Sequence, residues 1–236
     1  MKLNAESSGS LLYSIYNLSK ADKDANGSYD LFGEPFSHYW RLDGDYRYYR
    51  KVADHQQLVF RAVAGIGKTL ANLQALPFEK SFYGGGANDI RAWQIRSLGP
   101  GSYPGSSNFD QIGEMLLQGN LEYRAKLVKQ LDGALFIDAG NIWLLNPNAS
   151  FPGGDFQTNR FYKEIAIGSG IGARLNFGFF IIRFDLGIKI RDPQFDENKR
   201  WVIQHLFDQQ WKSDYINTHS AGYSFLNFNL GIGYPF

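Results

Sequence analysis

Few residues in the sequence are spaced for catalysis or for metal binding. Gly65-Ile66-Gly67-Lys68-Thr69 has the letters that end a phosphate-binding loop, but that motif needs a glycine where Ala62 stands and a helix after it, whereas Asn72 and Pro77 follow. Serine, histidine and aspartate are present without the setting of a nucleophile elbow. The chain has no cysteine, and none of its histidines has metal-ligand spacing: His38, His55, His205 and His219. The sequence therefore predicts neither an enzyme nor a metal or cofactor site.

One arginine stands out because of its surroundings. Arg91 lies in a bulky, turn-rich insertion over residues 76–101 that also holds several aromatic side chains and the run Gly84-Gly85-Gly86. A guanidinium is a planar fork that binds carboxylates through two hydrogen bonds and stays charged when it is removed from water. What Arg91 binds depends on the elements that position it.

Those elements are predicted to be long β-strands. Between Phe180 and Ile190 every even position is apolar, and Arg183, Asp185 and Lys189 lie between them. Because side chains alternate faces along a strand, one face is apolar and the other charged. The pattern recurs in about eight segments of 12 to 18 residues, near 3–17, 37–52, 56–69, 111–128, 131–144, 163–177, 179–191 and 223–236.

The length of these strands favours an all-β, antiparallel transmembrane β-barrel. A tilted crossing of the hydrocarbon core needs strands of about ten residues, more than soluble sheets usually contain. Aromatic side chains at the strand ends, such as Trp40 and Trp143, also fit a membrane interface. In this interpretation the apolar face meets lipid and the polar face lines a wet lumen. The strands of a soluble ligand-binding β-barrel or sandwich also alternate between apolar and polar side chains, so such a protein is the alternative interpretation.

Composition agrees with a β-rich chain and argues against some partners. Aromatic residues make up 16%, with 14 Tyr, 19 Phe and 5 Trp, and there are 26 Gly. A formal charge of +1 gives no support to nucleic-acid binding. No stretch approaches the roughly 20 apolar residues of a transmembrane helix, and residues 1–6 lack the apolar core of a signal peptide. Either a soluble protein or a fragment of a longer secreted chain would explain the absence of both a transmembrane helix and a signal peptide.

Three polar stretches are predicted to be loops of unequal length. They cover residues 19–36, 145–162 and 192–222. The last contains Trp201, Val202, Leu206, Phe207 and Trp211, a spacing that allows a short amphipathic helix. Outer-membrane barrels join their strands by short turns on one side and long loops on the other.

The insertion over residues 76–101 resembles the loop that folds into the lumen in the BamA/TamA-type outer-membrane assembly barrels, also called the bacterial surface antigen family. That loop carries a Val-Arg-Gly-Phe/Tyr motif at its tip, and the matching residues are Ile90-Arg91-Ala92-Trp93. The match departs at Ala92, where the family usually has the glycine that a tight backbone conformation favours.

A second motif strengthens the resemblance. The family has Phe-x-Asp-x-Gly two strands after the loop, and Phe136-Ile137-Asp138-Ala139-Gly140 fits it fully. By alternation Phe136 and Asp138 face the lumen. Glu122 resembles the lumenal glutamate of the strand between, and it also falls on the polar face. The resemblance implies that Arg91 is a structural latch that anchors the loop to Asp138 and Glu122.

The end of the chain fits the recognition strand of outer-membrane proteins. The pattern polar-x-Gly-x-x-aromatic-x-aromatic is met by Asn229, Gly231, Tyr234 and Phe236. Alternation places a row of residues on one face of this strand: Leu226, Phe228, Leu230, Ile232, Tyr234 and Phe236. Residues 45–49, 97–101 and the Gly-Tyr-Pro-Phe end look similar to the Bacteroidetes branch of the family.

The resemblance covers nearly the whole chain and implies its organisation. Residues 1–236 would form one outer-membrane barrel domain, the C-terminal half of a sixteen-stranded barrel, without the POTRA domains and the early strands. The expected role is insertion, assembly or translocation of outer-membrane or surface proteins in the bacterial outer membrane. Expected partners are outer-membrane lipids, client proteins and assembly-machinery subunits. A small outer-membrane pore is an alternative, since eight strands can close a narrow barrel.

Overall fold

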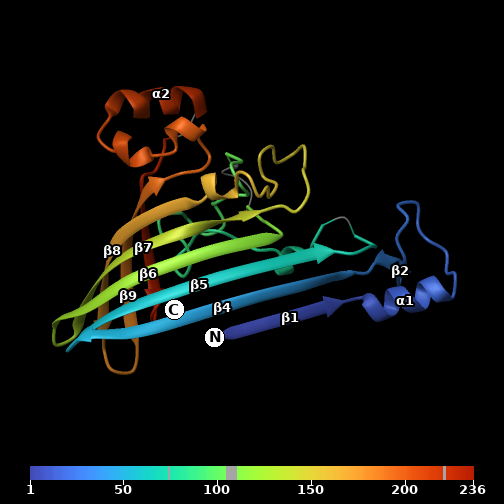
Figure 1. The fold of residues 1–236 in the computed structure, drawn as a ribbon, viewed down its shortest axis with the longest axis horizontal. Helices are drawn as coiled ribbons and strands as arrows, with labels where there is room; N and C mark the ends of the chain where they lie inside the picture. The colour runs from blue at the N-terminus through green and yellow to red at the C-terminus, as the bar shows by residue number, and fades with distance from the viewer. Residues whose placement is uncertain (74, 105–110, 220–221) are drawn as a thin grey trace.

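A computed structural model describes residues 1–73, 75–104, 111–219 and 222–236. These residues form one eight-stranded antiparallel sheet in the order β1-β4-β5-β6-β7-β8-β9-β10, which confirms the predicted all-β class. The strands are Lys2–Ser8 (β1), Tyr39–Ala53 (β4), Gln56–Thr69 (β5), Met115–Val128 (β6), Leu131–Trp143 (β7), Ala166–Asn176 (β8), Ile181–Arg191 (β9) and Leu226–Ile232 (β10). Neighbouring strands are also neighbours in sequence apart from short elements within loops, as in an up-and-down meander (Figure 1).

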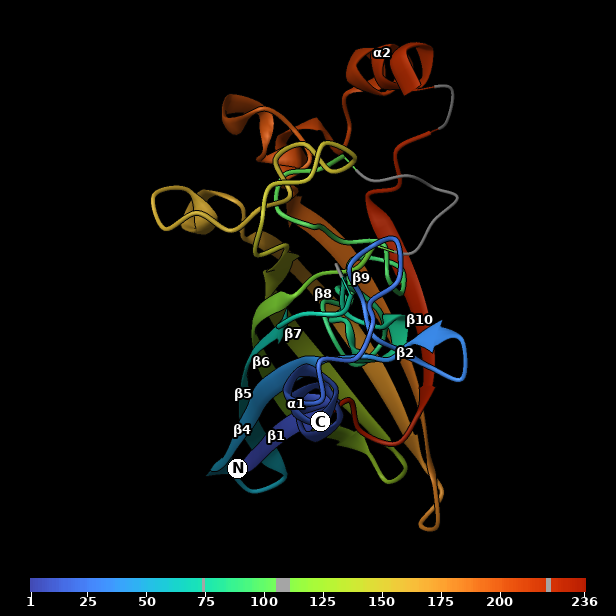
Figure 2. The ribbon, with the colours of Figure 1, turned by 90° about the vertical axis from the view of Figure 1, so that its right-hand side faces the viewer.

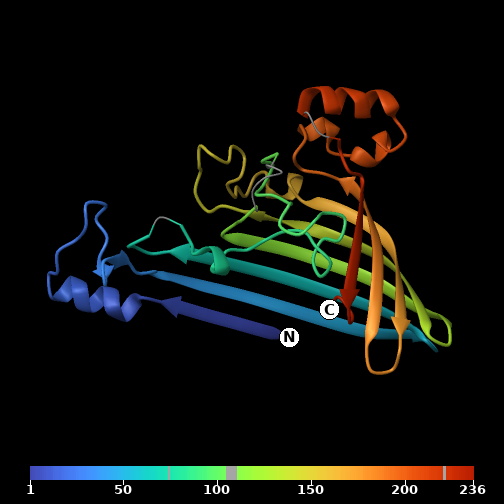
Figure 3. The ribbon, with the colours of Figure 1, turned by 180° about the vertical axis from the view of Figure 1, so that it is seen from behind.

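The sheet is curved and open, with β1 and β10 at its two edges. Figure 2 shows that it curls around an interior, called the lumen here, in which part of the segment between β5 and β6 lies. Short turns join the strands at one end, and the long connections lie at the other end (Figure 3). Three strands of the eight-stranded sheet precede the segment between β5 and β6 and five follow it, as the sequence predicts.

The burial of the central strands is the reverse of that in a soluble protein. On β7, Leu135 and Ile137 are 58% and 50% exposed on the convex face, whereas Asp138 on the concave face is fully buried. On β6, Leu121 is 41% exposed while its neighbour Glu122 is fully buried. An apolar outer face and a charged interior are stable in lipid, where apolar side chains need no cover.

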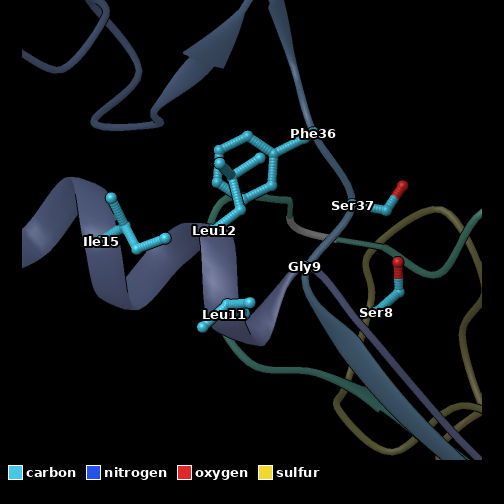
Figure 4. Close-up of a pocket in the computed structure, with 7 residues that line it drawn as sticks. All are labelled: Ser8, Gly9, Leu11, Leu12, Ile15, Phe36 and Ser37. Carbon is cyan, nitrogen blue, oxygen red and sulfur yellow. The ribbon is translucent and has the colours of Figure 1, made fainter.

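The first predicted strand, over residues 3–17, is wrong in its second half. β1 ends at Ser8 and is followed by helix α1 (Ser10–Leu18). The break lies at Gly9, whose φ is +71° and where a Cβ atom would stand 2.2 Å from the Ser37 carbonyl oxygen. Apolar residues follow at helical spacing and border a shallow cavity of about 520 Å³ in which Leu12 lies beside Phe36 (Figure 4).

The long connections contain short elements. The predicted loop 19–36 holds a two-stranded ribbon, β2 (Asp30–Leu31) and β3 (Glu34–Pro35), and 3-10 helix η1 (Phe78–Lys80) follows β5. The connection after β7 contains η2 (Phe161–Lys163), and the one after β9 contains η3 (Glu197–Lys199), η4 (Val202–His205) and α2 (Gln209–His219). The helix expected over residues 201–211 is thus split between η4 and α2. In the described part of the chain, no helix is long and apolar enough to cross a membrane.

Candidate functional site

The segment over residues 76–101, called the lumenal loop here, is folded back on itself inside the lumen. Isolated bridges pair Phe82 with Gly113 and Gly84 with Leu98, and they fix the base of the loop. The amide of Gly86 donates to the Trp93 carbonyl, which closes the tip around Ile90–Trp93. The tip packs into a buried apolar cluster that consists of Ile90, Ala92, Trp93, Leu98 and Ala166.

Arg91 is fully buried at this tip and binds two carboxylates of the sheet. Its Nε and Nη2 atoms donate to the two oxygens of Asp138 on β7, each at 2.8 Å, which is the bidentate geometry. Its Nη1 atom donates to Glu122 on β6. The backbone amide of Arg91 also donates to Asp138 at 3.1 Å. The structure therefore brings together one arginine and the two acidic residues singled out by sequence.

The Phe-x-Asp-x-Gly residues of β7 contact the loop from one face of the strand. The ring centroid of Phe136 lies 3.5 Å from the Arg91 guanidinium carbon, so the guanidinium stacks on the ring and meets Asp138 at its edge. Gly140 has no side chain and so leaves space for strand β6 and for the Ile90 side chain of the loop tip. A Cβ atom at residue 140 would stand 2.3 Å from the Leu117 carbonyl oxygen and 3.1 Å from the side chain of Ile90. All three motif residues thus act at the loop tip or beside it.

The departure from the family pattern at Ala92 has a structural explanation. Ala92 is not among the described non-glycine residues with positive φ, so its backbone needs no glycine. Its methyl group faces one glycine of the sheet, and its backbone faces another. A Cβ atom at Gly168 on β8 would lie 2.5 Å from the Ala92 methyl, and one at Gly187 on β9 would lie 2.8 Å from the Ala92 Cα. The Nζ of Lys189 lies 5.2 Å from the Trp93 ring centroid, next to the tip.

Arg91 and Glu122 belong to a larger buried network. Glu122 also binds Arg124 of its own strand at 2.7 Å and Arg174 of β8 at 3.0 Å, so three guanidinium groups meet one carboxylate. Arg174 continues to Asp185 of β9 at 2.7 Å. Alternation along the predicted strands puts Arg124, Arg174 and Asp185 on the polar face. It did not single them out as site residues, because alternation gives a side chain's face and not its partner across strands.

The electrostatics of the loop keep Arg91 charged and raise the pKa of Asp89. Burial works to lower the pKa of Arg91, but the hydrogen bonds and charges of Asp138 and Glu122 outweigh it and raise that pKa above its usual value. Burial raises the pKa of Asp89 from 3.8 to about 7; the charge of Arg61 opposes this shift and that of Asp138 adds to it. The charge of Arg91 is thus secure over the physiological range.

The last strand touches the loop tip through its polar side chains. Asn229 donates to the Arg91 carbonyl oxygen at 2.9 Å. Asn227, which sequence reasoning did not single out, donates to the carbonyl oxygens of Arg91 and Trp93, both at 2.9 Å. Gly231 lies against Arg183, since a Cβ atom there would stand 2.6 Å from its Nη2 atom.

The predicted position of the last aromatic residues is wrong. β10 ends at Ile232, and Gly233 has a φ of +82°, so strand alternation stops there. Tyr234 stays half-exposed with its ring 4.4 Å from the Arg124 guanidinium carbon. Phe236 is only 6% exposed and lies inside the lumen rather than on the convex face with Leu230.

This arrangement can hold a loop in place, and the described side chains form no nucleophile–base pair around Arg91. Within the residues that the structure describes, no group of three or more His, Cys, Asp or Glu is placed to hold a metal ion. The chemistry available is ion pairing, stacking and hydrogen bonding between the loop and the strands around it.

Comparisons with known proteins agree with the architecture. Residues 16–236 match the Omp85 superfamily domain. The outer membrane protein assembly factor BamA of Neisseria meningitidis serogroup B is 30% identical over 98 residues, which cover 36% of this chain and 12% of that protein. The solved structure of a Haemophilus ducreyi BamA lacking POTRA domains 1–3 has a TM-score of 0.51 at 16% identity and shares its fold with this chain over 64% of this chain and 32% of that one.

CdiB from Acinetobacter baumannii is a further solved structure that matches, with a TM-score of 0.42 at 17% identity over 66% of this chain and 24% of that one. The chain thus spans less than two thirds of the length of each of these proteins.

Proposed function

The chain belongs to the Omp85 superfamily of the bacterial outer membrane, and on that premise we propose that it assists the insertion or translocation of other proteins, with Arg91 as a structural latch. Assembly and translocation of outer-membrane proteins is the role of this family as a whole. Our proposal for this chain is that the lumenal loop, held by Arg91, keeps the sheet in a shape that is competent for this work.

The observation that carries the proposal is the complete burial of Arg91 between Glu122 and Asp138. A guanidinium without access to solvent cannot reach a substrate, so its role is to hold the structure. Removing one partner of a buried ion pair leaves an uncompensated charge and costs about 3–5 kcal/mol. A loop that crosses the lumen and ends in such a pair is fixed firmly to β6 and β7.

The partners follow from the two faces of the sheet. The convex face exposes large apolar side chains, including Leu135, Ile171 and Phe228, and we propose outer-membrane lipids as their cover. We propose outer-membrane or surface proteins as clients and assembly-machinery subunits as further partners. These are proposals for the whole protein, because the chain covers 12% of the curated relative and 32% of the solved BamA.

The test is Arg91→Ala in protein refolded into phospholipid vesicles. We expect loss of the compact, heat-modifiable form on gels and loss of insertion of a model β-barrel client added to the vesicles. Arg47→Ala is the matched control: Arg47 also forms a bidentate pair, with Asp45, but this pair is partly exposed and does not touch the lumenal loop. If Arg91→Ala changes neither barrel stability nor client insertion, the latch proposal is wrong.

A further inference from the structure

The lumenal loop is bound from two directions. On one side Glu122 and Asp138 hold the Arg91 side chain to the middle of the sheet. On the other side Asn227 and Asn229 of β10 hold the backbone of the same tip through three hydrogen bonds of 2.9 Å. The tip therefore spans the lumen between β6–β7 and the edge strand.

The segment after β10 adds a third contact to the same arginine. The turn at Gly233 brings Phe236 inward, where its ring centroid lies 5.6 Å from the Arg91 guanidinium carbon and 5.7 Å from that of Arg124. Phe136 lies on the same guanidinium at 3.5 Å, so Arg91 contacts two phenyl rings. Arg124 also donates to the Phe236 backbone oxygen at 3.4 Å, near the limit for a hydrogen bond.

In the described sheet, β10 has fewer backbone partners than the inner strands have. In the described sheet it pairs with β9 alone, over seven residue pairs from Leu226 to Ile232, whereas inner strands pair on both sides. Its outward side chains, including Leu230, are exposed, and Phe228 contacts Phe184 of β9, the strand with which β10 already pairs. Within the described residues, β10 is held by its ladder with β9 and by its side-chain contacts with the lumenal loop.

We propose that Asn227, Asn229 and Phe236 are positioning residues through which the Arg91 tip holds β10 against the lumen, so that releasing Arg91 from Asp138 frees this edge of the sheet. The inference rests on the latch role proposed above. It adds β10 as a second element that the loop tip holds in place. Because coupling between two sites is reciprocal, moving β10 outward must also weaken the hold of the sheet on the loop tip.

The experiment measures the position of β10 by distance between spin labels. The chain has no cysteine, so Ile232→Cys on β10 and Leu135→Cys on β7 give two unique labelling sites, both exposed on the convex face. The pair is measured in the protein refolded into phospholipid vesicles. The informative variant is Asp138→Asn, which contacts the loop tip but does not touch β10.

We expect Asp138→Asn to broaden the distance distribution and shift it to longer values, as Asn227→Ala combined with Asn229→Ala does directly. Leu230→Ala is the matched control on the outer face of β10 and is expected to leave the distribution unchanged. An unchanged distribution in Asp138→Asn, with the asparagine pair broadened, overturns the coupling. Client insertion, measured on the same samples, tests the proposed function separately, because insertion can fail while the distance stays fixed.

A second variant covers the case in which Asp138→Asn does not fold. Phe236→Leu leaves both carboxylates intact and removes only the aromatic contact from the tail. A single label at Ile95→Cys, an exposed position in the lumenal loop, then reports the mobility of the loop. Reciprocal coupling requires a more mobile label in Phe236→Leu and an unchanged one in Tyr234→Phe, which keeps its ring over Arg124. Equal mobility in both variants overturns the proposal.

Discussion

The Arg91 guanidinium lies 3.5 Å from the ring centroid of Phe136, two residues before the Asp138 carboxylate that binds the same group. Residues two apart on a strand share a face. One strand therefore supplies a stacking surface and a bidentate acceptor to a single guanidinium, which gives the Phe-x-Asp spacing a physical reason. The stacked ring also excludes water from the ion pair, and the pair is stronger in a dry environment.

Phe136→Leu tests the stacking contact. The substitution keeps most of the apolar volume and removes the ring, so we expect a loss of about 2–3 kcal/mol in the free energy of unfolding, from the lost cation–π contact and imperfect packing. Urea unfolding of the vesicle-inserted protein, followed by tryptophan fluorescence, measures it. Phe228→Leu, on the outer face of β10, should change stability by much less. Equal losses in the two variants would show that the stack on Arg91 contributes nothing.

Much of the fold is predictable from sequence because a membrane barrel obeys a simple period. Apolar and polar residues alternate along β6 to β9, and the predicted bounds of these four strands agree with the observed ones to within a few residues. The lumenal positions of Glu122, Phe136 and Asp138 follow from the same alternation. The family motif then indicates that Arg91 belongs with them, which periodicity alone cannot do.

Alternation fails where a single glycine changes the path of the chain. Leu11, Tyr13 and Ile15 continue a period-two pattern, but Leu11, Ile15 and Leu18 also have helical spacing. The turn at Gly9 ends the strand, and the helix forms after it. At the other end, Gly233 stops the alternation and brings Phe236 into the lumen. A glycine with positive φ cannot be told from other glycines in one sequence, so both errors arise from the same cause.

Glu122→Gln tests the carboxylate that three arginines share. The neutral side chain would leave Arg91, Arg124 and Arg174 with one buried negative partner fewer, and we expect a loss of about 3–5 kcal/mol in the free energy of unfolding. Asp54→Asn is the control, because the pair that Asp54 forms with Lys51 is exposed and exposed pairs contribute about 0–1 kcal/mol. The measurement is urea unfolding at neutral pH. A loss no larger than that of the control would contradict the shared-carboxylate interpretation.

Asp89→Asn tests the raised pKa in the lumenal loop. With a pKa of about 7 in the folded protein against 3.8 ordinarily, Asp89 keeps a proton that the unfolded chain has released, so stability falls as pH rises from about 4 to about 7. The penalty is complete above this window and absent below it. Each pKa unit corresponds to about 1.4 kcal/mol, and the partial exposure of Asp89 makes the loss of stability smaller than the full shift implies. Unfolding at pH 4, 6 and 8 should show a gain for Asp89→Asn that grows with pH.

The contact between Ala92 and Gly168 is open to a rescue experiment. A Cβ atom at residue 168 would lie 2.5 Å from the Ala92 methyl, so Gly168→Ala should lose about 1–3 kcal/mol through overpacking. Ala92→Gly removes the atom that clashes, and the double variant should recover most of the loss, as a double-mutant cycle of urea unfolding measures. Gly187→Ala is the control that Ala92→Gly cannot rescue, because its Cβ would meet the backbone of residues 91 and 92 at 2.8–2.9 Å. If Ala92→Gly rescues both variants or neither, the loop tip does not rest on these glycines as the structure places it.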